Sequence, residues 1–154
     1  IFLETAGVLG IKPNPQRVKE ALRDTRWEGR FEIVREKPLL VLDGAHNLHA
    51  LKGTLESLKT LKEFPLIIYG TMRDKDWKNQ LRLIRRYTDR IGLVEVNYHR
   101  SEKLENLYTT AVELGFREIR TYGSVKDMLE NLNGDTAILG SLYLIGEVKR
   151  FLQG

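Results

Sequence analysis

Short apolar runs alternate along the chain with longer stretches in which apolar residues recur every three to four positions. The apolar runs are Leu39–Leu42, Leu66–Tyr69, Ile91–Val96, Glu118–Thr121 and Ala137–Leu139. The longer stretches are His49–Leu61, Asp76–Tyr87, Leu104–Leu114, Ser124–Leu132 and Leu142–Leu152. The first pattern predicts buried β-strands and the second predicts amphipathic helices. Strands that alternate with helices favour a parallel sheet with helices on both faces.

One further segment has a different pattern. FEIVRE, residues 31–36, alternates apolar and polar positions, which predicts a half-buried strand at the edge of the sheet. The predicted fold class is therefore α/β: a Rossmann-like, mostly parallel sheet with helices on both faces and one antiparallel edge strand.

The first 27 residues predict two helices. Residues 2–11 have apolar residues at helical spacing, but this helix is too short to stand alone. The chain starts at Ile1 rather than Met, and we interpret this first helix as the tail of a preceding segment. In residues 14–27, Asn14 is a plausible N-cap and Pro15 takes the first helical position.

The composition excludes several classes of protein. A hydrophobic share of 42% and a charged share of 30% are typical of a globular domain, and 154 residues suffice for one. The absence of cysteine excludes disulfides and cysteine-based metal sites and fits a reducing compartment, so we expect a cytoplasmic protein. No apolar stretch approaches the roughly 20 residues that span a bilayer, and we expect neither a membrane interaction nor a signal peptide.

The net charge of +4 is small and scattered. Its densest segments, RRYTDR (85–90) and KRF (149–151), are not interleaved with stacking aromatic residues. Solvated helix faces explain them better than a nucleic-acid surface, and we expect no nucleic-acid partner. An anionic small ligand such as a nucleotide would suit the same charge balance.

Polar residues gather where four of the predicted strands end. Ligands of open parallel sheets bind beyond the carboxyl ends of the strands. The four loops there are DGAHN after Leu42, GTMRDKD after Tyr69, YHR after Asn97 and GS after Leu139. We expect the fold to bring at least some of these loops together on one rim.

The DGAHN loop carries the richest chemistry. Asp43 ends a buried strand, so its carboxylate could accept hydrogen bonds from a ribose or hold a cation. His46 is a donor or acceptor near neutral pH. Asn47 could cap the following helix, whose free N–H groups favour anions. A strand–turn–helix junction with Asp43 or Asn47 as a cap explains the same residues without function, and spacing alone leaves both possibilities open.

The other loops are less specific. In GTMRDKD, a helix N-cap at Asp74 or Asp76 would explain part of the pattern. In the GS loop, Ser141 presents a hydroxyl beside the N–H groups of a helix. The chain lacks both G-x-S-x-G and the phosphate-binding G-x-x-x-x-G-K-[ST]. His46 and His49 lack an evident third metal ligand, so we expect no metal site in this chain.

Four motifs in the same order resemble one branch of the Mur ligase superfamily, the folylpolyglutamate and dihydrofolate synthases. They are WEGRFE (27–32), LDGAHNLHA (42–50), YGTMRDKD (69–76) and LGSLYLIGEV (139–148). They are similar to the W-P-G-R-x-E, L-D-G-A-H-N-P-x-A, G-x-M-x-D-K-D and G-S-L-Y-L-x-G-E-V of its carboxyl-terminal domain. The sequence departs from this pattern at Glu28 and Leu48, where the branch has proline.

The resemblance implies an ATP-dependent ligase that joins L-glutamate to a carboxylate of folate or dihydropteroate through an acyl phosphate. It implies that residues 1–28 are the tail of an amino-terminal ATPase domain with a linker, and that 29–154 are the carboxyl-terminal domain. The amino-terminal domain would carry the P-loop and Mg²⁺.

The resemblance also implies roles for individual residues. Arg30 and Asp43 would contact the nucleotide, His46 would lie near the transferred phosphate and the glutamate, and Ser141 near the glutamate. The chain by itself would then be inactive. Two other readings are a non-catalytic Rossmann-like module that binds a nucleotide or protein, and a receiver-like signalling domain, for which the acidic residues are too few.

Overall fold

A computed structural model describes residues 2–24, 27–61 and 63–153. Its centre is a six-stranded sheet in the order β1-β2-β6-β3-β4-β5. The strands are β1 (Glu32–Glu36), β2 (Leu39–Asp43), β3 (Leu66–Tyr69), β4 (Arg90–Val94), β5 (Glu118–Tyr122) and β6 (Thr136–Leu139). β1 pairs antiparallel with β2, and the other neighbouring strands are parallel. The predicted α/β sheet with one antiparallel edge strand is therefore confirmed.

The predicted burial of β1 was wrong. After a half-buried Glu32, the strand is exposed, and Ile33 retains 51% of its accessible surface. The pairing of β1 with β2 shifts register between Ile33 and Arg35, which breaks the alternation of inward and outward residues. Neither core cluster includes a residue of β1, because the helices cover the parallel strands instead. An apolar–polar alternation therefore predicted the strand correctly but not a buried face.

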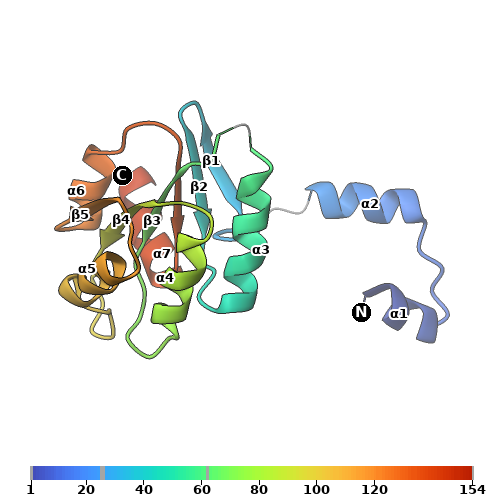
Figure 1. Cartoon of the computed structure of the whole chain (residues 1–154). Helices are drawn as coiled ribbons and strands as arrows, with labels where there is room; N and C mark the ends of the chain where they lie inside the picture. The colour runs from blue at the N-terminus through green and yellow to red at the C-terminus, as the bar shows by residue number, and fades with distance from the viewer. Residues whose placement is uncertain (1, 25–26, 62, 154) are drawn as a thin grey trace.

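The helices form a layer on each face of the sheet (Figure 1). Those on one face are α3 (Leu48–Lys59), α4 (Trp77–Arg85) and α5 (Leu104–Glu113), and those on the other are α6 (Val125–Glu130) and α7 (Leu142–Gln153). Side chains such as Leu55, Leu81 and Leu107 are fully buried under the first layer, and Val125 and Val148 under the second. The ends of these five helices lie within two residues of the predicted ones.

Two helices precede the sheet, α1 (Phe2–Val8) and α2 (Pro15–Asp24), and Figure 1 shows them to one side of the layered body. The predicted cap of α2 is confirmed, because the Asn14 Oδ1 accepts hydrogen bonds from the backbone N–H groups of Gln16 at 2.9 Å and Arg17 at 3.2 Å. The last part of the predicted helix 14–27 includes residues 25–26, which lie outside the described residues. In the described part of the chain, no helix is long and apolar enough to cross a bilayer.

Candidate functional site

The four polar loops lie on one rim because the strands that lead into them, β2, β6, β3 and β4, are consecutive in the sheet. Direct contacts join the loops. The Arg73 side chain donates to the backbone carbonyl of His99 at 3.2 Å. The rings of Tyr98 and Tyr143 stack with their centroids 4.0 Å apart, which connects the loop after β4 to the start of α7. The expected convergence of these loops is therefore confirmed.

The loop before β1 docks onto the DGAHN loop. The backbone N–H of Gly44 donates to the carbonyl of Gly29 at 2.7 Å, and the N–H of Phe31 donates to the carboxylate of Asp43 at 3.0 Å. The fit is close, because a Cβ at Gly44 would lie 2.2 Å from the end of the Leu142 side chain. These contacts bring Arg30 to the same rim as the carboxyl end of β2.

Asp43 faces inward rather than out of the rim. Only 6% of the residue is exposed. One carboxylate oxygen accepts from the N–H of Ala45 at 2.8 Å, and the other accepts from the N–H of Phe31 and from the Thr54 hydroxyl, each at 3.0 Å. Phe31 has a positive φ of 44°, a conformation uncommon outside glycine, and this hydrogen bond helps to hold it. In this structure Asp43 joins β2, α3 and the loop that carries Arg30.

One ring nitrogen of His46 contacts the backbone, and the other has no hydrogen-bond partner among the described residues. Its Nδ1 lies 2.9 Å from the carbonyl oxygen of Gly44. A carbonyl only accepts hydrogen bonds, so Nδ1 must carry the proton, and in the neutral ring Nε2 is left with a lone pair. The backbone of His46 is fixed as well, because the Gln80 side chain donates to its carbonyl at 3.2 Å.

Gln80 is in turn oriented by a buried tyrosine. The Tyr69 hydroxyl donates to the side-chain oxygen of Gln80 at 3.0 Å. Burial raises the pKa of Tyr69 far above its ordinary value, so this hydroxyl keeps its proton and remains a donor. A chain of hydrogen bonds therefore runs from β3 through α4 to the His46 backbone. Gln80 was not among the predicted site residues, because a polar residue within an amphipathic helix gives no sign of burial.

Asn47 and Ser141 both act at helix N-termini. The Asn47 side chain accepts from the N–H of Ala50 at 2.9 Å, which confirms the predicted cap of α3. The Ser141 Oγ accepts from the N–H of Tyr143 at 3.1 Å, in the first turn of α7, and the residue is 2% exposed. The side chain of Ser141 is therefore oriented by the helix that it precedes.

Arg30 carries an unpaired guanidinium in the part of the chain that the structure describes. Its backbone N–H donates to the carbonyl of Trp27, and the residue is exposed. Among the described residues its guanidinium has neither a hydrogen-bond partner nor an ion-pair partner. A planar guanidinium of this kind can bind two oxygens of one phosphate or carboxylate.

The GTMRDKD loop is organised by charge rather than by a helix cap. Asp76 occupies the N-cap position of α4 but makes no side-chain capping bond there, and its carboxylate accepts from the Asn79 amide instead. Asp74 lies 3.5 Å from the Lys75 ammonium and 3.7 Å from the Arg100 guanidinium. The slight desolvation of Asp74 would raise its pKa, but a backbone hydrogen bond and these two cations lower it below the ordinary value.

A group of ion pairs that was not predicted joins the Arg30 loop to α7. The Lys149 ammonium on α7 lies 3.0 Å from a carboxylate oxygen of Glu28 and 3.1 Å from one of Glu32. Glu32 also accepts from the backbone N–H of Gly29 at 2.7 Å. Lys149 is separated from this loop by more than a hundred residues, so no local pattern could indicate the contact. We call Lys149, Glu28 and Glu32 the loop clamp.

In the part of the chain that the structure describes, no group of three or more histidine and carboxylate side chains is placed to hold a metal ion. The rim instead offers a free guanidinium, an imidazole with an available lone pair, and the N-termini of α3 and α7. The guanidinium and the helix N-termini suit an anionic ligand, and the imidazole lone pair can accept a proton from a group bound beside that ligand. The fold and the site together define an α/β domain with an anion-accepting rim.

The chain belongs to the Mur ligase, glutamate ligase domain family, whose model matches residues 29–141. It is 28% identical over 141 residues to the folylpolyglutamate synthase of Lacticaseibacillus casei, an alignment that covers 91% of this chain and 33% of that protein. The crystal structure of folylpolyglutamate synthase from Thermotoga maritima superposes with a TM-score of 0.76 at 29% identity, over 98% of this chain and 36% of that one.

A third comparison concerns the fold alone. The folylpolyglutamate synthase of Mycobacterium tuberculosis, solved with ADP and AMPPCP, superposes with a TM-score of 0.79 at 21% identity, over 97% of this chain and 37% of that one. The chain spans about a third of the length of the Lacticaseibacillus casei relative and of a Bacillus subtilis dihydrofolate synthase/folylpolyglutamate synthase that it also matches.

Proposed function

We propose that this chain is the carboxyl-terminal domain of an ATP-dependent folate ligase, a folylpolyglutamate synthase, a dihydrofolate synthase or an enzyme with both activities. The observation that carries the proposal is that Arg30, His46 and Ser141, which come from three of the four motifs that resemble this branch of the family, lie at the same rim of the sheet. The ligase family to which the chain belongs and its folylpolyglutamate synthase relatives support the same assignment.

The reaction forms an amide in two steps. ATP, bound with Mg²⁺, supplies the γ-phosphoryl group, which a carboxylate oxygen of folate or dihydropteroate accepts as ADP leaves. The amine of L-glutamate then attacks the carbonyl carbon of the acyl phosphate, loses a proton and displaces inorganic phosphate. An acyl phosphate reacts readily with water, so a domain that closes over the site has a chemical purpose.

In this proposal the residues of the rim divide these tasks. The exposed Arg30 guanidinium binds phosphate oxygens, for which its planar arrangement of donors is suited. The Nε2 of His46, left with a lone pair by the Nδ1 contact with Gly44, accepts a hydrogen bond from the glutamate ammonium or takes up its proton. Ser141 lies beside the glutamate. Asp43 acts on the nucleotide through the Arg30 loop, which its carboxylate positions.

The remaining parts come from elsewhere in the proposed enzyme. The sequence contains no phosphate-binding G-x-x-x-x-G-K-[ST], so the P-loop and most Mg²⁺ ligands belong to an amino-terminal domain. Residues 1–28 form the tail of that domain with a linker, and residues 29–154 the carboxyl-terminal domain. Besides that domain, the partners are L-glutamate and folate or dihydropteroate.

The test is a ligase assay on the full-length protein that contains this chain, with ATP, L-glutamate and either a monoglutamyl folate or dihydropteroate. We expect amide formation with at least one acceptor. We expect Arg30→Gln and His46→Gln each to lower kcat/KM about tenfold or more, since each removes a charged or proton-accepting group. The matched control is Arg117→Gln, whose exposed arginine follows α5 at the opposite edge of the sheet.

The thermal midpoint of each variant checks that it folds. If the full-length protein forms no amide with either acceptor, the ligase proposal fails and a non-catalytic binding module becomes the better explanation. Equal activity of the wild type and both rim variants would reject the assigned residues while leaving the reaction in place.

A further inference from the structure

A basic groove lies between α3 and α4, outside the rim described above. One part has a volume of about 410 Å³ and is lined by Lys52, Lys59, Phe64, Leu83, Arg86 and Tyr87. A second part of about 300 Å³ shares three of these residues and adds Leu48, Asn79 and Arg82. The two parts form one continuous groove, which we call the α3–α4 groove.

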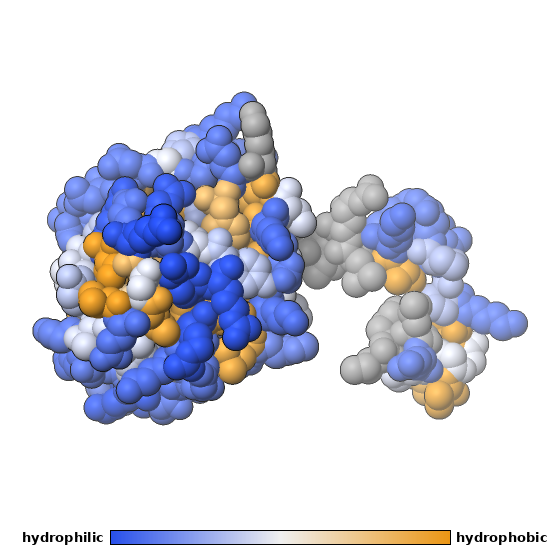
Figure 2. All heavy atoms as spheres, viewed as in Figure 1, coloured by the Kyte–Doolittle hydropathy of each residue, from blue (hydrophilic) through white to orange (hydrophobic). Residues whose placement is uncertain are grey.

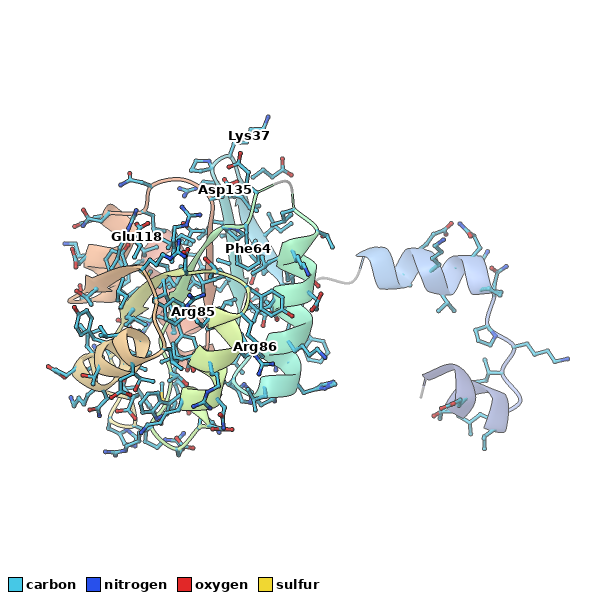
Figure 3. All side chains as sticks on the ribbon, viewed as in Figure 1. Lys37, Phe64, Arg85, Arg86, Glu118 and Asp135 are labelled. Atoms are coloured by element: carbon cyan, nitrogen blue, oxygen red, sulfur yellow. The ribbon has the colours of Figure 1, made fainter. Side chains whose placement is uncertain are left out.

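The groove combines an apolar floor with cations at its sides. Phe64 and Tyr87 stack with centroids 6.3 Å apart, and Leu83 is half-buried between the helices. Figure 3 shows Phe64 and Arg86 on the side of the molecule where α3 and α4 meet, and Figure 2 shows strongly hydrophilic side chains over α4 beside a smaller apolar area.

The cations of the groove are not neutralised by the protein itself. Lys52, Lys59, Arg82 and Arg86 are exposed, and none of them has an ion pair with a carboxylate among the described residues. The carboxylate that reaches the floor is Glu56, which accepts a hydrogen bond from the Tyr87 hydroxyl and raises the pKa of that tyrosine. Four like charges over one groove raise the local concentration of a polyanion.

We propose that the α3–α4 groove binds the γ-linked polyglutamate chain of the folate substrate. This inference rests on the proposed ligase function and adds a second site to it, separate from the rim at which the new amide forms. Each γ-linked glutamate keeps one free α-carboxylate, so the chain is a flexible polyanion with a carbon backbone. Its carboxylates pair with the four cations, and its methylene groups lie on Leu83 and the aromatic floor.

Two features favour this occupant. One end of the groove, at Leu48 and Asn79, adjoins the rim, because Leu48 is two residues after His46 and Asn79 contacts Asp76 of the GTMRDKD loop. A chain could therefore extend from the reacting carboxylate directly into the groove. The length also fits, since α3 has 12 residues and is about 18 Å long at 1.5 Å per residue, which leaves room for several glutamates.

The first experiment measures binding directly. Pentaglutamate joined through γ-amides is titrated onto this 154-residue chain by calorimetry, in parallel with free glutamate and with an oligonucleotide of similar charge. We expect the pentaglutamate to bind, free glutamate to bind more weakly, and the affinity to fall as the salt concentration is raised from about 0.05 M to about 0.5 M. No detectable binding of the pentaglutamate would overturn the proposal, and so would tighter binding of the oligonucleotide.

Variants then locate the site. Lys52→Gln/Lys59→Gln/Arg86→Gln removes three groove cations, and we expect it to weaken pentaglutamate binding about tenfold or more. The control, Arg117→Gln/Lys126→Gln/Arg150→Gln, removes the same charge from exposed residues elsewhere on the surface and should retain the wild-type affinity. An equal loss in both triple variants would show that only net charge matters, and would reject the groove.

A kinetic experiment separates this inference from the proposed function. In the full-length protein, the groove variant should keep the wild-type kcat/KM for a monoglutamyl folate but show a KM about tenfold higher for a pentaglutamyl folate. If the groove variant has full activity on both substrates, the groove is rejected as the polyglutamate site and the proposed ligase function stands. Absence of ligation by the wild type would reject the ligase, while the calorimetric result would still decide whether the groove binds the polyanion.

Discussion

At the scale of single residues, the Asp43 side chain joins three segments at the rim. Its two carboxylate oxygens accept three hydrogen bonds, from two backbone N–H groups and one hydroxyl, and these donors belong to three different segments. A buried carboxylate is tolerated when it is satisfied in this way. The residue therefore contributes to stability and to the placement of Arg30 at the same time.

The first prediction tests this dual role with Asp43→Asn. An asparagine has one acceptor oxygen and must turn its amide towards at least one donor, so one or more buried N–H groups lose their partner. We expect the free energy of unfolding to fall by about 1–3 kcal/mol, measured by urea denaturation. Thr54→Val is the matched control. It removes one of the three bonds, so it should cost less than Asp43→Asn, and an equal cost would contradict the assignment.

The sequence identified this residue but not its orientation. Spacing left open whether this aspartate faces a ligand or caps a helix, and the resemblance implied contact with a nucleotide. The strand and the rim are where the pattern placed them. The direction of its carboxylate depends on Phe31, twelve residues earlier, and on Thr54, eleven residues later. A pattern within one segment holds no information about contacts with two others. His46 and Ser141 were likewise located at the rim, while the Nδ1 contact and the bond from Tyr143 came from the structure.

At the scale of elements, the loop clamp joins α7 to the loop that carries Arg30. Partial burial would raise the pKa of Glu32, but the Gly29 N–H and the Lys149 ammonium lower it below the ordinary value of 4.5. The Glu28 carboxylate is the largest cause of a raised pKa at Lys149, partial burial opposes it, and Glu32 adds to the rise. Both shifts mean that the ion pair favours the folded state.

The second prediction concerns the pH dependence of stability. The contribution of Glu32 is present above its unfolded pKa and is lost as the pH falls through its lower folded pKa. The contribution of Lys149 is present below its unfolded pKa of 10.5 and is lost as the pH rises through its higher folded pKa. We expect Lys149→Met to lower the free energy of unfolding at neutral pH by about 1 kcal/mol, a value discounted for partial exposure.

The measurement is a series of denaturation curves from about pH 3 to about pH 7. The difference between wild type and Lys149→Met should shrink as the pH falls below about 4.5, because the protonated Glu32 no longer pairs with Lys149. A constant difference over the whole range would contradict the clamp. Lys126→Met removes an exposed lysine that lies 3.9 Å from Glu130 and should change stability little at any pH.

The third prediction compares two glycines. Gly140 has a φ of +112°, and a Cβ there would lie 2.6 Å from the carbonyl oxygen of Gly70. Gly53 is within α3, and a Cβ there meets no atom within 4 Å. We expect Gly140→Ala to destabilise the fold by about 1–3 kcal/mol, and Gly53→Ala to stabilise it by about 0.5–1 kcal/mol. Urea denaturation measures both changes in the free energy of unfolding, which we expect to have opposite signs. A Gly140→Ala variant as stable as the wild type would contradict the steric restriction at Gly140.

Helices and strands were predicted correctly where burial against neighbouring elements sets the hydrophobic pattern of the segment. The helices follow a period of 3.6 because each buries one stripe, and the central strands β2, β3 and β6 follow a continuous apolar run because each buries both faces. The two edge strands are the exceptions. β5 was predicted to be buried, but only Tyr122 is, while Arg120 and Thr121 are exposed at the edge of the sheet. The alternation of β1 is broken by a register shift, and the core lies under other strands, so its apolar residues remain exposed. Burial of an edge strand depends on what covers the sheet there, and the strand itself does not encode that.

At the scale of the whole molecule, the rim and the α3–α4 groove are two surfaces of one layered domain. The first gathers Arg30, His46 and Ser141 from segments more than a hundred residues apart, because β2 and β6 are adjacent in the sheet. The second lies between two helices on one face, and it starts where the rim ends. Both surfaces present cations to an anionic ligand, and neither includes a P-loop of this chain.

The fourth prediction follows from that division. The 154-residue chain by itself should form no measurable amide from ATP, L-glutamate and folate or dihydropteroate, because the phosphate-binding loop that orients the triphosphate belongs to the proposed amino-terminal domain. The full-length protein, assayed at the same concentration, is the positive control. Turnover by the 154-residue chain at a rate near that of the full-length protein would contradict the division of labour, since the rim residues would then suffice to bind and orient ATP without a partner domain.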